Sequence, residues 1–183
     1  MNQGINITND DIRGSHVLFA YESDEEQIRM LAEYLKDGLA NNELCVYVTP
    51  SSKKQIIKEL KAAGLNVQSA VDDGRVRIYD MNETYLPDGT FSRDYMLDNV
   101  SKFLGDAASE GYNGLRTAGT MTWLYDHPEY ADEADHYEHL VNDLKVKHPD
   151  FTGLCLYPVR RGSSKVIDKA MHSHPSIIYN STV

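Results

Sequence analysis

The side chains best placed to do chemistry stand at the ends of apolar runs that predict β-strands. Tyr21, Glu22 and Ser23 follow the first such run, and Trp123 and Tyr157 lie at the ends of two later ones. Aromatic rings with polar tips can wall a small-molecule pocket, and neighbouring polar groups can orient a guest. In an open parallel sheet, ligands bind beyond the carboxyl ends of the strands. These residues therefore predict a binding crevice at that edge of the sheet.

The polar residues that could orient such a guest are Glu22, Arg116 and Thr120, and His16 is a further candidate donor at the start of the first strand. A purely structural interpretation accounts for the same residues. In it, Trp123 belongs to the core and His16 is a buried hydrogen-bonding residue. Arg116 and Glu22 then form an ion pair that fills the crevice. The sequence leaves both interpretations open.

The turn between the first strand and the following helix lacks the features of a phosphate-binding loop. No glycine occurs between Gly14 and Gly38, and the chain contains no Gly-Lys-Ser/Thr sequence. Instead, Glu22 and the three acidic residues at 24–26 stand at the start of the helix. Carboxylates at the positive end of a helix occupy the anion site themselves and repel a triphosphate. We therefore expect no nucleotide here.

The sequence around the candidate serine and cysteine nucleophiles does not favour catalysis. Ser23 lies at a strand-to-helix turn, but the glycines of a nucleophile elbow are absent, and a helix cap with Glu26 is the stronger account. Cys45 and Cys155 each lie in an apolar run without a basic neighbour. We expect both thiols to be buried and reduced, and we expect no catalytic residue.

Histidines and carboxylates pair at helical spacing, which raises the question of a metal site. No recognised metal signature is present, and an exposed charged helix explains most of these residues. His174 is more simply interpreted as fixing the approach to the last strand. We therefore predict no metal and no cofactor. The pairs considered are Glu133 with His136, Asp135 with His139, and His172 with His174.

Composition excludes several classes of protein. The 183 residues are 41% apolar and 25% charged, with a formal net charge of −10. An acidic chain does not suit direct binding to nucleic acid or to an anionic membrane. No apolar run approaches the roughly 18 residues of a membrane span, and the N-terminus does not resemble a signal peptide. The prediction is a cytoplasmic protein.

Strand-like runs alternate with helical patterns along the whole chain. This alternation predicts βαβ units, and hence one α/β domain over residues 14–183 in three layers, with a mostly parallel sheet covered by helices on both faces. Residues 1–13 are expected to form a flexible arm. Strands are predicted at 17–19, 44–49, 76–79, 115–119, 154–157 and 177–179, with 120–123 continuing the fourth and 82–93 forming a loop.

The chain also resembles two known groups of proteins. Residues 35–49 and 60–78 are similar to RecA-like proteins of the circadian-clock ATPase (KaiC) type. A closer resemblance, from His16 to Pro175, is to the MEDS domain, the sensory domain of methanogens, methylotrophs and the dichloromethane-responsive regulator. Thr120 departs from it, because an acidic residue is expected there. The residues that carry it are His16, Tyr21-Glu22-Ser23, Gly38, Glu43, Cys45-Val46-Tyr47, Tyr85, Gly89, Phe91, Gly111-Tyr112, Gly114-Leu115-Arg116, Gly119, Met121, Trp123, Tyr137-Glu138, Asn142, Cys155, Tyr157 and His174-Pro175.

The MEDS resemblance implies a RecA-like fold whose phosphate loop has decayed, and a non-enzymatic sensory module. Its expected ligand is a small organic molecule such as a one-carbon or hydrocarbon-derived compound, bound in the degenerate crevice. Its expected partner is a regulatory protein or a histidine kinase. Two alternatives remain: an interaction or homo-oligomerisation module with a filled crevice, and an atypical nucleotide hydrolase.

Overall fold

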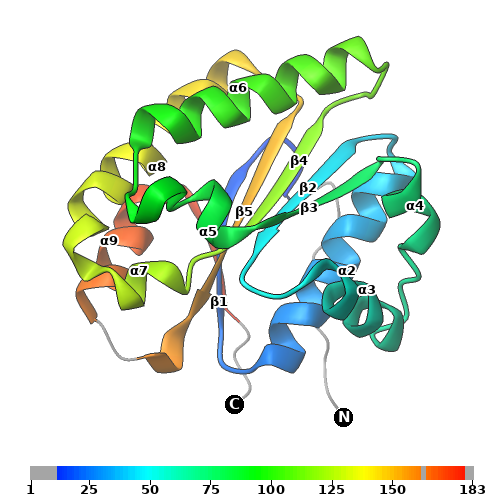
Figure 1. Cartoon of the computed structure of the whole chain (residues 1–183). Helices are drawn as coiled ribbons and strands as arrows, with labels where there is room; N and C mark the ends of the chain where they lie inside the picture. The colour runs from blue at the N-terminus through cyan, green and yellow to red at the C-terminus, as the bar shows by residue number, and fades with distance from the viewer. Residues whose placement is uncertain (1–11, 162–163, 180–183) are drawn as a thin grey trace.

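The sheet has six strands, every neighbouring pair of which is parallel (Figure 1). This computed structural model describes residues 12–161 and 164–179. The strand order is β3-β2-β4-β5-β1-β6, so the chain starts near one edge with β1, crosses to the other edge with β2 and β3, and returns through β4 and β5 to β6. The strands are β1 (His16–Tyr21), β2 (Leu44–Thr49), β3 (Val76–Asp80), β4 (Leu115–Thr120), β5 (Phe151–Pro158) and β6 (Ser176–Tyr179).

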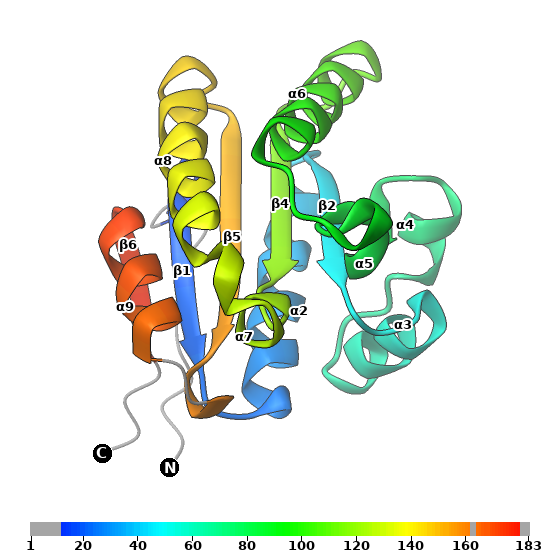
Figure 2. The same ribbon diagram turned by 60° about the vertical axis from the view of Figure 1, so that its left-hand side comes forward.

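Helices cover both faces of this sheet, which confirms the predicted three-layer α/β fold (Figure 2). One face carries α2 (Asp24–Ala40), α3 (Lys53–Ala62) and α4 (Gln68–Asp72). The opposite face carries α5 (Met81–Thr84), α6 (Arg93–Ser109), α7 (Trp123–Asp126), α8 (Ala131–Lys147) and α9 (Ser164–Ser173). Short 3₁₀ turns lie at Pro87–Gly89, Pro128–Tyr130 and Val159–Arg161.

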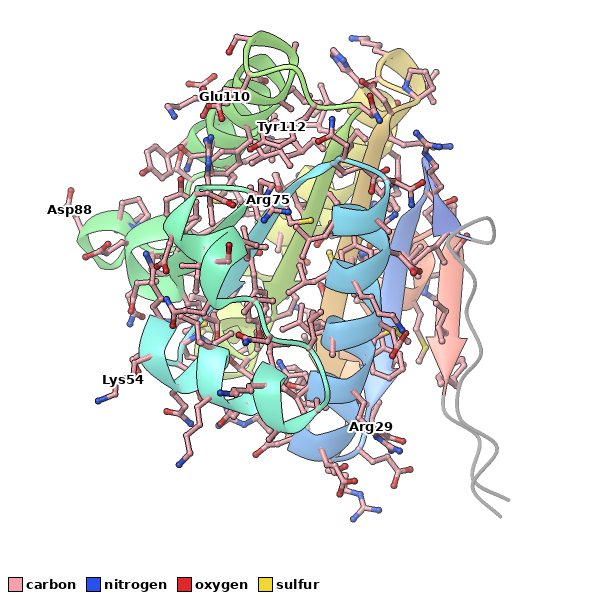
Figure 3. The ribbon with its side chains drawn as sticks, turned by 90° about the vertical axis from the view of Figure 1, so that its right-hand side faces the viewer. Arg29, Lys54, Arg75, Asp88, Glu110 and Tyr112 are labelled. Atoms are coloured by element: carbon pink, nitrogen blue, oxygen red, sulfur yellow. The ribbon has the colours of Figure 1, made fainter. Side chains whose placement is uncertain are left out.

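Because successive side chains of a strand point to opposite faces, each strand contributes to two separate cores. In β1, Val17 and Phe19 pack under α2, while Leu18 packs under the opposite helices. All three are fully buried, as is typical of parallel strands covered on both sides. Figure 3 views the α2 layer from outside, where Arg29 and Lys54 point to solvent. The sheet thus divides the interior into two compartments that do not share side chains.

Two predicted boundaries need correction. The expected loop at 82–93 contains the last residues of α5. Asp80 starts α5 because its carboxylate accepts hydrogen bonds from the backbone N–H groups of Asn82 and Glu83. Of residues 120–123, predicted to continue the fourth strand, only Thr120 does so, since β4 ends there and α7 begins at Trp123.

Two residues of the expected N-terminal arm belong to the packed domain. Ile12 is buried in the core under α2. The Arg13 guanidinium lies 3.4 Å from the Glu43 carboxylate. Residues 1–11, the rest of that predicted arm, lie outside the described residues.

A buried ion pair fixes β4 against α2 and the start of β2. Arg116 donates from Nε to Glu43 Oε2 at 2.6 Å and from Nη1 to the Tyr34 carbonyl at 3.2 Å, and both charged side chains are fully buried. The guanidinium also lies 4.6 Å from the centre of the Tyr34 ring. Gly38 makes this possible, because a Cβ there would come within 2.8 Å of Arg116 Cδ. Arg116 is thus enclosed by protein.

Arg116→Met should therefore lower the free energy of unfolding by about 3–5 kcal/mol, because it leaves Glu43 buried without its main counter-ion. Urea denaturation measures this loss. The control is Arg75→Met, which removes an exposed pair with Asp73 and should change stability little. Equal effects of the two substitutions would contradict a structural role for Arg116.

Candidate functional site

Four ionisable or metal-ligating side chains meet on the sheet face that α8 covers. His16 comes from β1, Glu138 from α8, Cys155 from β5, and His174 from the turn before β6. We call these four residues the polar cluster. His16 Nε2 lies 3.1 Å from Glu138 Oε2 and 3.5 Å from Cys155 Sγ. His174 Nε2 lies 3.7 Å from Glu138 Oε2, and the two imidazole centres are 4.3 Å apart.

Local structure explains how these side chains reach one point. β1 and β5 are parallel neighbours, with His16 opposite Gly153. The absence of a side chain at Gly153 leaves room for the imidazole, since a Cβ there would lie 3.1 Å from the His16 ring. Cys155 follows two positions later on the same face of β5. α8 packs over this face of the sheet, and its Glu138 side chain points toward His16 and Cys155.

Hydrogen bonds on the outer side of the polar cluster fix both imidazole tautomers. The Asn142 amide nitrogen donates to the Ser173 carbonyl at 2.7 Å, so its oxygen faces His16 Nδ1 at 2.8 Å. An amide oxygen only accepts, and Nδ1 of His16 must therefore carry a proton. Likewise, Nδ1 of His174 donates to the Ala170 carbonyl at 2.7 Å. Both histidines consequently direct Nε2 at the Glu138 carboxylate.

Burial and mutual contacts set the charges of the polar cluster. Burial lowers the pKa of His174 from 6.5 to about 4, although Glu138 acts in the opposite direction. Burial alone would raise the pKa of Glu138, but His174, His16 and the Tyr157 hydroxyl outweigh it and hold that pKa below its usual value. Burial, and then Glu138, raise the pKa of the Cys155 thiol well above its ordinary value. At neutral pH, Glu138 is ionised and His174 is neutral.

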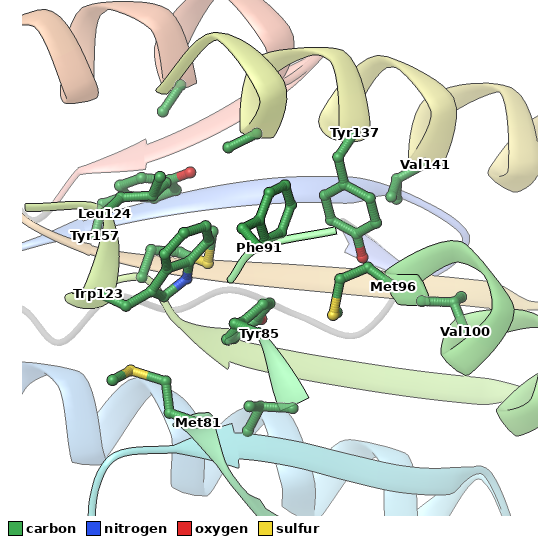
Figure 4. Packing of buried hydrophobic residues seen from close by; sticks show 14 of the residues in the cluster. Met81, Tyr85, Phe91, Met96, Val100, Trp123, Leu124, Tyr137, Val141 and Tyr157 are labelled. Atoms are coloured by element: carbon green, nitrogen blue, oxygen red, sulfur yellow. The ribbon is translucent and has the colours of Figure 1, made fainter. Parts of the chain in front are cut away.

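An internal cavity adjoins the polar cluster, between the sheet and helices α6 and α8. Its volume, measured as the space that the centre of a water molecule can occupy, is about 40 Å³. Figure 4 shows part of its wall, where Met96 and Val100 of α6 face Tyr137 and Val141 of α8. Its polar lining includes His16, Glu138, Cys155, Thr84, Thr117, Tyr85 and Tyr137, and its apolar lining includes Val46, Val48, Met96, Val100, Phe103, Met121, Val141, Phe151 and Leu154.

The eight residues predicted to line one crevice do not form a single group, because the sheet separates them, although His16 and Tyr157 both contact Glu138. On the α8 face lie His16, Trp123 and Tyr157. On the α2 face lie Tyr21, Thr120 and the enclosed Arg116. Glu22 and Ser23 are in the exposed turn that leads into α2. One reason is the alternation of side chains along each strand, which directs Tyr21 and Tyr157, at neighbouring strand ends, to opposite faces. A second reason is that His16 and Arg116 lie near the beginnings of β1 and β4 and not at their carboxyl ends.

The residues on the α2 face and in the turn have partners within the protein. Thr120 Oγ1 lies 2.8 Å from the Tyr47 hydroxyl and accepts from Gln27 at 2.8 Å. Glu22 pairs with Arg160, and not with Arg116 as the structural interpretation expected. Ser23 caps α2 as predicted, with its Oγ accepting from the Glu26 N–H at 3.3 Å. Tyr21 is buried.

The aromatic residues of the α8 face have distinct surroundings. Trp123 is 1% exposed and stacks on Phe91 and Tyr85, with ring centres 4.8 and 5.4 Å away. The Tyr157 hydroxyl donates a hydrogen bond to Glu138 at 3.5 Å and so contacts the polar cluster. Figure 4 shows Trp123 and Tyr157 within the same packed face.

Of the polar cluster, the sequence predicts only His16 as a site residue, and for His174 it favours a structural role over that of a metal ligand. Its members are far apart in the chain, with His16 and Cys155 separated by 139 positions, so no local motif reveals them. Imidazole, carboxylate and thiolate are all metal ligands. Within residues 12–161 and 164–179, the polar cluster is the one group of three or more potential metal ligands. The pairs Glu133 with His136 and Asp135 with His139 are therefore not part of such a group.

The His174 environment predicts a pH dependence for metal-free protein. A pKa depressed from 6.5 to about 4 means that unfolded His174 takes up a proton that folded His174 does not. The free energy of unfolding should therefore fall by up to about 3 kcal/mol as the pH drops from about 6.5 to about 4. Glu138, whose pKa is lowered, adds a loss of the same sign at the acid end.

Urea denaturation at a series of pH values, after dialysis against EDTA, measures this dependence. His174→Gln should flatten it in this range. His172→Gln, a change to an exposed residue of α9, should leave it intact. A wild-type stability that does not vary between these pH values would contradict the prediction.

Comparison with known proteins identifies a family whose model matches most of the chain. The model of the methanogen/methylotroph, DcmR sensory domain (MEDS) matches residues 15–175. The transcriptional repressor DcmR of Methylorubrum extorquens is 26% identical over 160 residues, which is 87% of this chain. The chain spans 57% of the length of that relative.

A solved structure supports the fold. A KaiC-like protein from the archaeon Pyrococcus horikoshii superimposes with a TM-score of 0.63 over 98% of this chain and 79% of its own, at 14% identity. At that identity the likeness concerns the fold alone. Within the described part of the chain, no helix has the length and apolar character needed to cross a membrane. Since the family model covers most of its 183 residues, the chain belongs to the MEDS family of sensory domains.

Proposed function

We propose that this domain binds a small organic ligand in the internal cavity and reports its presence through protein contacts, without catalysing a reaction. The observation that carries the proposal is the cavity itself, which has apolar walls and a polar end formed by His16, Glu138 and Cys155. Pockets of this composition hold the apolar part of a ligand by burial and orient its polar part by hydrogen bonds. The site therefore lies inside the α8 face, away from the crevice predicted at the strand ends.

The size of the cavity supports a very small ligand. One water molecule needs about 10–15 Å³ of the same measure. The 40 Å³ present would hold about three water molecules, or an organic molecule of a few heavy atoms. One-carbon and two-carbon compounds, or short hydrocarbon derivatives, fall in this range. Larger metabolites would require α6 and α8 to separate.

Several features argue against a nucleotide hydrolase. The N-terminus of α2 is occupied by its own chain, with Ser23 capping Glu26 and the Glu26 carboxylate accepting from the Glu22 N–H at 2.7 Å. A triphosphate would have to displace these groups and approach carboxylates. This supports a degenerate phosphate loop and a non-enzymatic role. Turnover of ATP in the presence of Mg²⁺ would overturn that part of the proposal.

The output requires a partner, which we propose to be a regulatory protein or a histidine kinase in the cytoplasm. The similarity to a transcriptional repressor supports such a role, and the net charge of −10 favours contact with protein over direct contact with nucleic acid. The alternative of an oligomerisation module draws on the filled α2 face, where Arg116 near the start of β4 and Thr120 at its end are both buried. The internal cavity favours the ligand sensor.

Ligand-observed NMR tests the proposal with a panel of methanol, formate, methylamine and dichloromethane. At least one should bind the wild-type chain, and Val141→Phe should abolish that binding, because the added ring fills the cavity that Val141 lines. The matched control is Val146→Phe on the same helix, where the side chain is 77% exposed. It should bind like the wild type.

The milder Val141→Leu keeps this test valid if the phenylalanine variant does not fold. It should weaken binding without abolishing it. Circular dichroism checks that each variant retains its helices. Failure of the whole panel to bind wild type, or unchanged binding by folded Val141→Phe, would contradict the proposed cavity site.

A further inference from the structure

We propose that the polar cluster binds one divalent transition-metal ion, with Zn²⁺ as the best match, through His16 Nε2, a Glu138 oxygen, Cys155 Sγ and His174 Nε2. This inference goes beyond the proposed function and does not depend on it. It also departs from the expectation of no metal that the sequence patterns gave.

Hydrogen-bond acceptors are in excess at the centre of the polar cluster. Since both histidines carry their proton on Nδ1, each Nε2 offers a lone pair in the neutral ring. These lone pairs face a carboxylate, at 3.1 Å for His16 and 3.7 Å for His174. The donors present are the Cys155 thiol and the Tyr157 hydroxyl.

His174 Nε2 shows the consequence of this excess. It is buried and makes no hydrogen bond, although it points into the cluster. An unpaired buried polar atom is costly, and facing acceptors repel one another. A cation placed among the four ligand atoms would satisfy all of them at once.

The spacing of the four ligand atoms suits zinc. Zinc bonds are about 2.0–2.3 Å long, so the ligand atoms of a tetrahedral site lie roughly 3.3–3.8 Å apart. The distances from Glu138 oxygens to both Nε2 atoms and to Cys155 Sγ, and from His16 Nε2 to that sulfur, run from 3.1 to 4.0 Å. All four ligand atoms lie within 4.8 Å of one another. Small rotations of the side chains would complete the tetrahedron. Imidazole, carboxylate and thiolate are the three kinds of ligand that Zn²⁺ takes in proteins.

Groups behind the two histidines hold the rings in the orientation of metal ligands. Histidines that bind metals usually donate their other ring N–H to a carbonyl or carboxylate, which holds the ring in place. Here His16 donates to the Asn142 amide oxygen, and His174 donates to the Ala170 carbonyl. Asn142 is itself held by the Ser173 carbonyl. Both rings are thus positioned from behind with the metal-binding nitrogen forward.

Charge balance supports a divalent ion in this buried place. One carboxylate and one metal-bound thiolate carry two negative charges, which a bound Zn²⁺ neutralises. The competing account places a proton in the cluster, as an imidazolium of His16 paired with Glu138. That account requires no metal and leaves Cys155 as an ordinary thiol, so spectroscopy separates the two.

Titration of the full chain with Co²⁺, after removal of metal by EDTA, is the decisive experiment. We expect saturation at one equivalent, the intense visible bands of four-coordinate cobalt, and a thiolate-to-cobalt charge-transfer band in the near ultraviolet. Cys155→Ser should lose the charge-transfer band. The matched control, Cys45→Ser, should keep it, because Cys45 is buried on the α2 face of the sheet.

Three results would overturn the proposal: no Co²⁺ binding, binding without a thiolate band, or a thiolate band that survives in folded Cys155→Ser. X-ray absorption of the wild-type zinc form keeps the test independent of any variant. It should show one sulfur at about 2.3 Å and nitrogen or oxygen ligands at about 2.0–2.2 Å. A shell without sulfur would also overturn it.

Asn142 acts as a positioning residue in this site. Asn142→Ala should weaken Zn²⁺ affinity by about 10–100-fold while leaving the thiolate band of the cobalt form in place. Asn142→Asp should recover part of the affinity, because its carboxylate can accept from His16 Nδ1. Asn113→Ala, which changes a distant exposed amide contact, serves as control. Equal affinity of Asn142→Ala and wild type would contradict this role.

Discussion

The buried carboxylate of Glu138 is the constraint on which the α8 face depends. An ionised group excluded from water is tolerated only where other polar groups surround it. Those groups come from β1, β5 and the turn after α9, so the carboxylate joins the first and last parts of the chain. Satisfying this group, together with the packing of Ala134, Tyr137 and Val141, holds α8 over the sheet and so shapes the cavity.

The α2 face meets the same requirement in a different way. Arg116 and Glu43 pair directly, with Tyr34 supplying a carbonyl and a ring face, and Gly38 supplying the space. This arrangement is filled and leaves no room for a guest. Because the sheet separates the two faces, one can be packed for rigidity while the other keeps a cavity. The division of roles is a direct result of strand alternation.

The strand-end turn before α2 is filled by its own side chains. The fold resembles that of a KaiC-like protein, yet the groups at the start of α2 are bonded to one another and to Arg160. The open space lies instead within the layer between the sheet and helices α6 and α8. A ligand there would contact two helices at once. Helices that share a buried ligand are well placed to pass its presence to a surface partner.

The sequence by itself determined the α/β class, the strands, the cap at Ser23 and the family. These depend on local periodicity and on residue patterns that span the chain. It could not determine that Trp123 begins a short helix, that Arg116 pairs with Glu43, or that Glu138 and His174 join His16 and Cys155. Strand order and helix docking decide which distant residues share a face. Only the tertiary structure, by burying those side chains together, brought residues 139 positions apart into one site.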